Sequence, residues 1–82
     1  MAMMFEDVLR RLSTLVGDAL DLEELELTPN MTAKNVEGWD SLAQIRIMVA
    51  IETEFGIRFE THEVAGLPTV GALAELVLRK AG

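Results

Sequence analysis

Cysteine is absent from the 82-residue chain, and histidine occurs only once, at His62. Disulfides and thiolate metal sites are therefore excluded, and one imidazole cannot build a histidine-rich metal site. Basic residues are also scarce, with 7 Lys and Arg against 14 Asp and Glu, for a net charge of −7. Binding to a nucleic-acid backbone needs clustered Lys and Arg, so nucleic acid is not expected as a partner. Hydrophobic residues make up 50% of the chain, enough for it to fold.

Long apolar runs are missing too, since the longest strictly apolar run covers only residues 47–51. That run is far too short for a membrane span. No basic-then-apolar signal segment opens the sequence, so we expect a cytoplasmic location. The length predicts one domain over residues 1–82, which we expect to be monomeric and which has no room for a large catalytic chamber.

The first half of the chain divides into a helix and a long connection. Apolar residues over 5–16 recur at the spacing of one helix face, and Gly17 is the expected stop of this helix. Residues 18–40 follow no sustained period, and a connection of this length is either functional or locally structured. Within it, residues 21–27 are expected to form a helical turn or two.

The second half predicts three more helices. Ser41–Phe55 is apolar over more than half of its circumference and ends at Gly56, so we expect it to lie at the centre of the molecule. Residues 60–65 indicate a brief helix, and Thr69 is the expected N-cap of the last one. The predicted fold is all-α: a small four-helix bundle of three principal helices and one short helix, with a long loop between helices 1 and 2.

The segment Gly38-Trp39-Asp40-Ser41-Leu42 opens the longest apolar helix. A purely structural interpretation fits it, because Ser41 with Gln44 matches a capping box, and Asp40 could equally be the N-cap. Ser41 is not expected to be a catalytic nucleophile, since no activating base lies near it in sequence and a Gly-x-Ser-x-Gly elbow is missing.

Gly-x-Asp-Ser-Leu at the start of an apolar helix, in an acidic chain of this size, resembles the phosphopantetheine attachment site of an acyl carrier protein. The similarity covers nearly the whole chain, from the first amphipathic helix and the long acidic loop to the Pro68-Thr69-Val70 start of the last helix. It includes the Ala50-Ile51-Glu52-x-Glu54-Phe55 ending of the second helix.

The resemblance implies that Ser41 is the attachment residue. A separate phosphopantetheinyl transferase (holo-carrier synthase) would move 4'-phosphopantetheine from coenzyme A onto its hydroxyl through a phosphodiester, contacting Asp40 and Leu42. The thiol of the arm would hold acyl groups as thioesters. The other implied partners are acyl-activating enzymes or acyltransferases, and condensing or modifying enzymes of fatty-acid, polyketide or specialised lipid biosynthesis. The chain itself would not be an enzyme, with no catalytic or metal-binding residue.

Two further comparisons with fatty-acid carriers bear on the acyl group and on the pathway. By alignment with fatty-acid carriers, Met48, Ile51, Phe59 and Leu67 would face a cavity for the acyl chain, which the aromatic Phe59 would narrow. The exposed helix face, which is acidic in those carriers, would hold Ala43 and Arg46 here in place of acids, while Glu52 and Glu54 retain the acidic character. That departure adds a specialised carrier, for a secondary metabolite, a lipid modification or an unusual acyl unit, to the functions that the sequence leaves open.

Two alternatives remain open at this point. One is an aminoacyl or peptidyl carrier of a nonribosomal system, and the other is an acidic helical interaction module without a prosthetic group. The charge distribution adds a separate prediction, because residues 18–40 hold seven acids and one base and so account for −6 of the net −7. We expect basic partner surfaces to engage this loop, including Glu23, Glu24 and Glu26.

Overall fold

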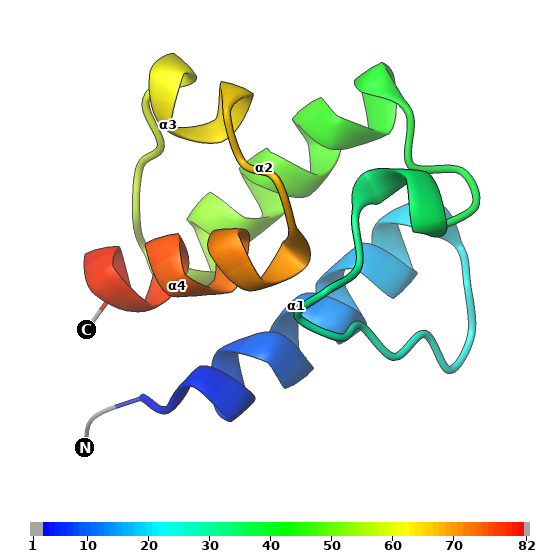
Figure 1. Ribbon diagram of the computed structural model, residues 1–82, viewed down its shortest axis with the longest axis horizontal. Helices are drawn as coiled ribbons and strands as arrows, with labels where there is room; N and C mark the ends of the chain where they lie inside the picture. Colours follow the sequence, from blue (N-terminus) through cyan, green and yellow to red (C-terminus); the bar gives the residue numbers. More distant parts are fainter. Residues whose placement is uncertain (1–2, 82) are drawn as a thin grey trace.

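Four α-helices and one short 3-10 helix build the computed structural model, which describes residues 3–81. Over that range there is no strand, and the all-α prediction of three principal helices and one short helix is confirmed. In Figure 1, α1 (Phe5–Leu20) begins and α4 (Val70–Ala81) ends on the same side of the molecule, and α2 (Ser41–Phe55) and α4 run back toward it. No helix in residues 3–81 is long and apolar enough to cross a membrane. The elements in order are α1 (Phe5–Leu20), η1 (Ala33–Asn35), α2 (Ser41–Phe55), α3 (Thr61–Ala65) and α4 (Val70–Ala81). Residues 1–2 and 82 of the predicted domain lie outside the described range.

Helix α1 presents a fully buried stripe to the core and is longer than predicted. Val8, Leu12 and Val16 repeat every four residues, and none of their surface is exposed. The helix ends at Leu20 and is capped by Asp21, which adopts the left-handed conformation with φ 57° and ψ 43°. The expectation that Gly17 stops this helix is therefore wrong.

Gly17 instead allows the loop to approach α1 closely. The Leu22 N–H donates to the Gly17 carbonyl at 2.8 Å. A Cβ atom on Gly17 would lie 3.0 Å from the Leu22 carbonyl oxygen, tighter than ordinary contact. A side chain at position 17 would therefore crowd the Leu22 carbonyl, and the returning loop would have to shift by a few tenths of an ångström.

The loop between α1 and α2 is tied to the bundle by backbone hydrogen bonds. The helical turn expected over residues 21–27 does not form; η1 is the only helical part of this connection. Leu27 is buried, and its N–H donates to the Ser13 hydroxyl oxygen at 3.0 Å. Further on, the Gly71 N–H donates to the Pro29 carbonyl at 2.9 Å. The loop is locally structured because its polar backbone groups find partners on α1 and α4.

The core lies between α1, α2 and α4, and α1 is the helix that packs against both others. The expectation that α2 lies at the centre is therefore wrong. Its apolar sector is broad because it has two parts, of which only one, with Ile47 and Ile51, is buried. The other part faces solvent.

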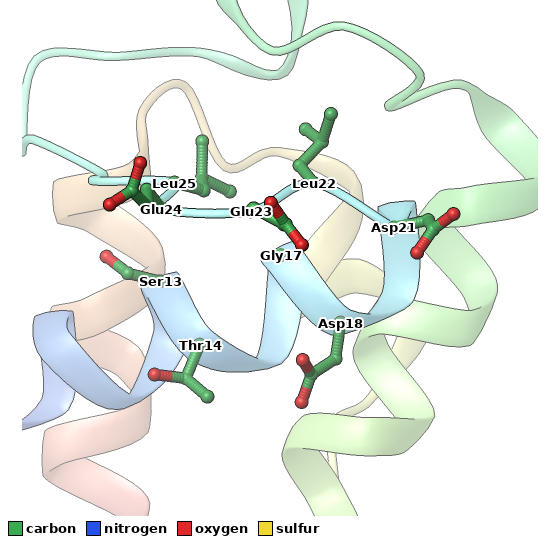
Figure 2. A pocket seen from close by; sticks show the side chains of 9 residues that line it. All are labelled: Ser13, Thr14, Gly17, Asp18, Asp21, Leu22, Glu23, Glu24 and Leu25. Carbon is green, nitrogen blue, oxygen red and sulfur yellow. The ribbon is translucent and has the colours of Figure 1, made fainter.

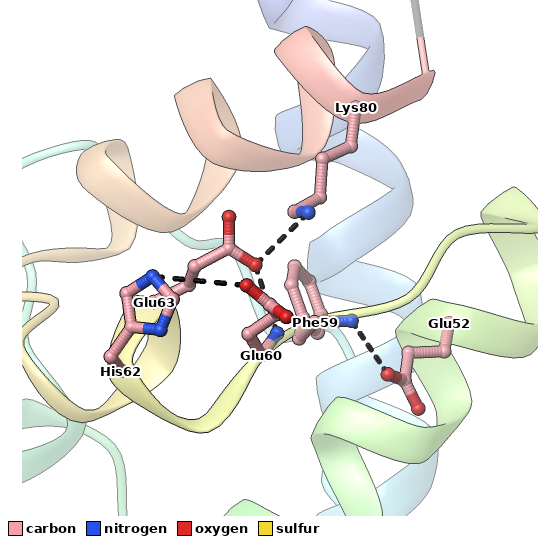
Figure 3. A network of polar contacts seen from close by, with 6 residues as sticks. All are labelled: Glu52, Phe59, Glu60, His62, Glu63 and Lys80. Carbon is pink, nitrogen blue, oxygen red and sulfur yellow. Dashed lines mark hydrogen bonds and ion pairs between the residues drawn. The ribbon is translucent and has the colours of Figure 1, made fainter.

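Short helix α3 is tethered by carboxylates rather than by a large apolar face (Figure 3). Glu63 accepts a hydrogen bond from the Glu60 N–H at 2.8 Å and pairs with Lys80 Nζ of α4 at 2.9 Å. On the other side, the Phe59 N–H donates to Glu52 of α2 at 2.8 Å. These contacts fix the connection between α2 and α3 at both ends.

Candidate functional site

The junction before α2 is a tight turn that depends on a glycine. Gly38 has φ +89°, a conformation that residues with side chains rarely adopt. The Asp40 N–H donates to the Gly38 carbonyl at 3.0 Å, and the Trp39 N–H donates to the Val36 carbonyl at 3.2 Å. The turn thus sets the direction in which the chain enters α2.

Asp40 is the residue that caps α2. Its Oδ1 accepts a hydrogen bond from the Ala43 N–H at 2.8 Å, and its carbonyl accepts from the Gln44 N–H at 2.8 Å. Of the two capping possibilities, Asp40 is correct, and the Ser41–Gln44 capping box does not form. Gln44 instead accepts a hydrogen bond from Trp39 Nε1 at 2.6 Å.

Ser41 is consequently the first residue of α2 and has no structural task for its hydroxyl. The residue is exposed, and its Oγ takes part in none of the hydrogen bonds found within residues 3–81. The N–H groups of Ser41 and Leu42 also have no acceptor inside the helix, as is general for the first turn. A phosphate on Ser41 Oγ would meet these donors at the positive end of the helix dipole, so the residues present fit a phosphodiester.

A shallow hollow of about 310 Å³ adjoins Ser41, and we call it the Ser41 hollow. It is lined by Ala33, Trp39, Asp40, Ser41 and Gln44.

The three residues predicted for this site are neighbours, and all three are exposed. Leu42 stands out, because 74% of its surface is accessible although it is a large apolar residue. Ile45 and Val49, one and two turns further, are 63% and 54% exposed. We call Leu42, Ile45 and Val49 the α2 stripe.

The sequence reasoning missed the α2 stripe because it assigned all the large apolar residues of this helix to contacts with neighbouring elements of the fold. The signal was present, since a sector wider than half a helix exceeds what one packed interface covers. The same reasoning placed Ala43 on the exposed face, and that is wrong, because Ala43 is fully buried. Arg46 is exposed, as expected, and is the only charged residue between positions 41 and 51.

Another hollow, of about 400 Å³, lies between the second half of α1 and the start of the loop. Figure 2 shows four carboxylates around it, from Asp18, Asp21, Glu23 and Glu24. It has no lining residue in common with the Ser41 hollow. It belongs to the acidic loop rather than to the junction at Ser41.

The chain is similar to known carrier proteins over most of its length. Residues 10–77 match the family described as "Phosphopantetheine attachment site". An acyl carrier protein from Saccharopolyspora erythraea is 27% identical over 73 residues, which is 89% of this chain and 77% of the relative. The solution structure of a holo acyl carrier protein from Geobacter metallireducens superposes with a TM-score of 0.83 and 32% identity, covering 89% of this chain and 84% of that one.

These similarities extend well beyond the junction at Ser41 and include the fold as a whole. Members of the matched family attach phosphopantetheine, which is therefore the prosthetic group of this chain. Acyl carrier proteins are carriers and not enzymes, and they work with a phosphopantetheinyl transferase and with biosynthetic enzymes. The chain belongs to the phosphopantetheine-attachment family and is an acyl carrier protein.

Proposed function

We propose that Ser41 is the attachment residue and that Asp40 and Leu42 are contacted by the transferase. The attachment proposal is supported by the arrangement at the start of α2, where Asp40 caps the helix and the Ser41 hydroxyl is exposed. Ser41 Oγ bonds to the pantetheine-linked phosphorus of coenzyme A, the pyrophosphate P–O bond breaks, and 3',5'-adenosine bisphosphate leaves. The hydroxyl proton goes to a base of the transferase. Bound phosphopantetheine supplies a terminal thiol that carries acyl groups as thioesters.

The attachment test uses the only other serine of the chain as its control. The protein is incubated with coenzyme A, Mg²⁺ and a broad-specificity phosphopantetheinyl transferase, and its intact mass is measured. Wild type and Ser13→Ala are expected to gain one phosphopantetheine, because the Ser13 hydroxyl is engaged with Leu9 and Leu27. Ser41→Ala is expected to gain none, and a gain by this variant would refute the assignment.

The carrier is proposed to act as a single-domain monomer in the cytoplasm, on acyl intermediates of a specialised lipid, polyketide or other secondary-metabolite pathway. Arg46 supports the specialised role, because it places a positive charge beside the α2 stripe where common fatty-acid carriers have acids. The aminoacyl or peptidyl carrier considered from the sequence shares the prosthetic group, but the similar proteins are acyl carrier proteins and do not favour it. Loading with acyl-activating against aminoacyl-activating enzymes separates the two. The module without a prosthetic group is contradicted by the family match.

Partner enzymes are proposed to dock over the α2 stripe, which begins next to Ser41. Exposed apolar residues arranged along one helix face are typical of interaction sites. With Arg46 as the only charge in this half of α2, the complementary partner surface is apolar with an acidic group at its edge. The acidic loop meets a separate, basic part of the partner.

A further inference from the structure

A partly apolar groove lies between residues 6–14 of α1 and residues 24–29 of the loop that returns beside it. Its volume is about 630 Å³, and we call it the α1 groove. Leu9 and Leu25 line it with aliphatic side chains that the core covers only in part. The Leu27 N–H donates to the hydroxyl of Ser13, another lining residue, at 3.0 Å. This contact holds the loop against α1 and so fixes the two walls of the groove.

The α1 groove is separate from the junction at Ser41. None of its lining residues belongs to α2 or to residues 30–40. It is also separate from a smaller cavity of about 220 Å³, which Met48 and Leu67 line as expected from the alignment, whereas Ile51 and Phe59 do not. Its occupant is therefore sought in something other than the prosthetic group and its cargo.

The α1 groove continues into the hollow shown in Figure 2. Ser13, Thr14, Glu24 and Leu25 line both. Together the two surfaces carry six carboxylates and one basic side chain, that of Arg10, which is a balance of −5. The six acids are Glu6, Asp18, Asp21, Glu23, Glu24 and Glu26.

These six carboxylates lack counter-charges within the molecule. None of them forms an ion pair with a basic side chain within residues 3–81, and Arg10 pairs instead with Asp7 at 3.7 Å. Like charges in one region repel one another, and a basic surface that binds there relieves the repulsion. Over the same residues no three acidic side chains are placed to hold a metal ion, so several separate cationic groups fit this region better than one ion.

We propose that the α1 groove and the adjoining hollow bind a basic segment of a partner enzyme, which inserts an aliphatic side chain beside Leu9 and Leu25. Lysine or arginine side chains that flank it meet Glu6 on α1 and Glu24 and Glu26 on the loop. Nucleic acids and anionic membranes do not fit, because these carboxylates repel phosphate groups. The proposal deepens the loop docking proposed above, since it makes the partner surface both basic and apolar. It does not depend on attachment at Ser41.

Two synthetic peptides test the chemistry of the occupant. One is acetyl-Lys-Lys-Leu-Lys-Lys-amide, and the other has serine in place of the leucine. Each is titrated into the holo protein and into the unmodified chain at about 0.15 M salt, where long-range attraction is largely screened, and amide NMR shifts give the dissociation constant. The leucine peptide is expected to shift the amide signals of Leu9 and Leu25. It should bind roughly tenfold more tightly than the serine peptide, because its leucine is removed from water.

Glu6→Gln with Glu26→Gln removes one charge from each wall of the groove. Both side chains are exposed, so the variant is expected to fold as wild type. It should bind the leucine peptide roughly 2- to 30-fold more weakly, the equivalent of two exposed ion pairs. Glu37→Gln with Glu75→Gln changes two exposed acids that line neither surface. This control of equal charge is expected to bind as wild type does.

Three results would overturn the proposal. They are equal binding of the two peptides, shifted signals that lie outside the groove and the hollow, and a Glu6 and Glu26 variant that binds the leucine peptide as the control does. Failure of the attachment at Ser41 is seen separately, because the intact mass then shows no added phosphopantetheine while the unmodified chain still reports peptide binding.

Discussion

Asp40 and Ser41 are adjacent in sequence, yet the carboxylate satisfies the helix while the hydroxyl is free. Either side chain is chemically able to cap a helix, since Ser and Asp are both favoured there. The Gly38 turn places Asp40, and not Ser41, at the position where the side chain meets the Ala43 N–H. At the scale of single residues, the exposure of the Ser41 hydroxyl therefore depends on the N-cap being at position 40 and not at position 41.

Asp40→Ala tests this assignment by stability. Loss of the cap is expected to lower the free energy of unfolding by about 1 kcal/mol, because the Ala43 N–H loses its acceptor. Asp40→Asn keeps an acceptor oxygen and is expected to retain most of that stability. Chemical denaturation of the three proteins measures both effects. Equal stability of wild type and Asp40→Ala would contradict the capping role.

At the scale of the element, α2 has two apolar faces with different tasks. Ile47 and Ile51 are fully buried, whereas the α2 stripe of Leu42, Ile45 and Val49 is more than half exposed. Burial in the core explains the first set. The second set contributes little to folding, so its apolar character points to contacts with other molecules.

Two isoleucines of α2 separate these tasks experimentally. Ile45→Ser is expected to change stability by no more than about 0.5 kcal/mol, because the side chain is exposed. Its kcat/KM for loading by the transferase is expected to fall roughly tenfold, the equivalent of about 1.4 kcal/mol of lost contact. Ile47→Ala is expected to cost about 2–5 kcal/mol of stability through a core cavity. Unchanged loading of Ile45→Ser would remove the α2 stripe from the transferase interface.

Helix α3 is held in place by a polar contact and not by a buried apolar face, because the Glu63 carboxylate connects it to α4. The hydrogen bond from the Glu60 N–H, with a smaller contribution from Lys80, holds the pKa of Glu63 below its ordinary value of 4.5. A lowered folded-state pKa means that the unfolded chain binds the proton more readily. The tether therefore contributes stability above pH 4.5, and this contribution is lost as the pH falls through the lowered pKa.

The pH dependence of the α3 tether is measurable at one backbone amide. The NMR shift of the Glu60 N–H, which donates to Glu63, is expected to titrate with a midpoint below 4.5. Glu63→Gln should remove that titration, because the amide side chain takes up no proton in this range. A midpoint at or above 4.5 in wild type would show that the contact does not stabilise the carboxylate.

At the scale of the whole molecule, the negative charge is concentrated in the connection between α1 and α2. Residues 18–40 carry −6 of the net −7, and the acids around the hollow of Figure 2 belong to this segment. The first half of α2, by contrast, carries one positive charge. Negative charge therefore precedes Ser41 in the chain and a positive charge follows it. This asymmetry orients a charged partner as well as attracting it.

Charge reversal tests the role of the loop. Glu23→Lys with Glu26→Lys is expected to slow loading by the transferase at low salt and to flatten its dependence on ionic strength, because long-range attraction is lost. Glu24 is left unchanged, since its positive φ of 56° makes the position sensitive for other reasons. Glu6→Lys with Glu75→Lys, two exposed acids on α1 and α4, is the control of equal charge. Identical salt dependence of the two double variants would refute docking through the loop.

Much of the fold was predictable because it follows from local patterns. The apolar spacing in α1 and α4, the ends of α2 at Ser41 and Gly56, and the Thr69 hydroxyl that accepts from the Ala72 N–H are all consequences of neighbouring residues. Gly17 was misjudged because its role depends on a loop that returns from outside the helix. The Asp-Ser-Leu segment was found from its resemblance to a carrier site, while the choice of cap required the actual turn.

The sequence by itself determined the number of helices, the acidic loop and the position of Ser41 at the start of α2, since each depends on residues close together along the chain. Only the tertiary structure decided which apolar residues of α2 are buried, and that Gln44 accepts a hydrogen bond from Trp39 instead of capping the helix. The physical reason is that burial is a property of what lies opposite a side chain. For α2 that opposite surface comes from α1, a distant part of the chain, so the spacing of apolar residues within α2 cannot reveal it.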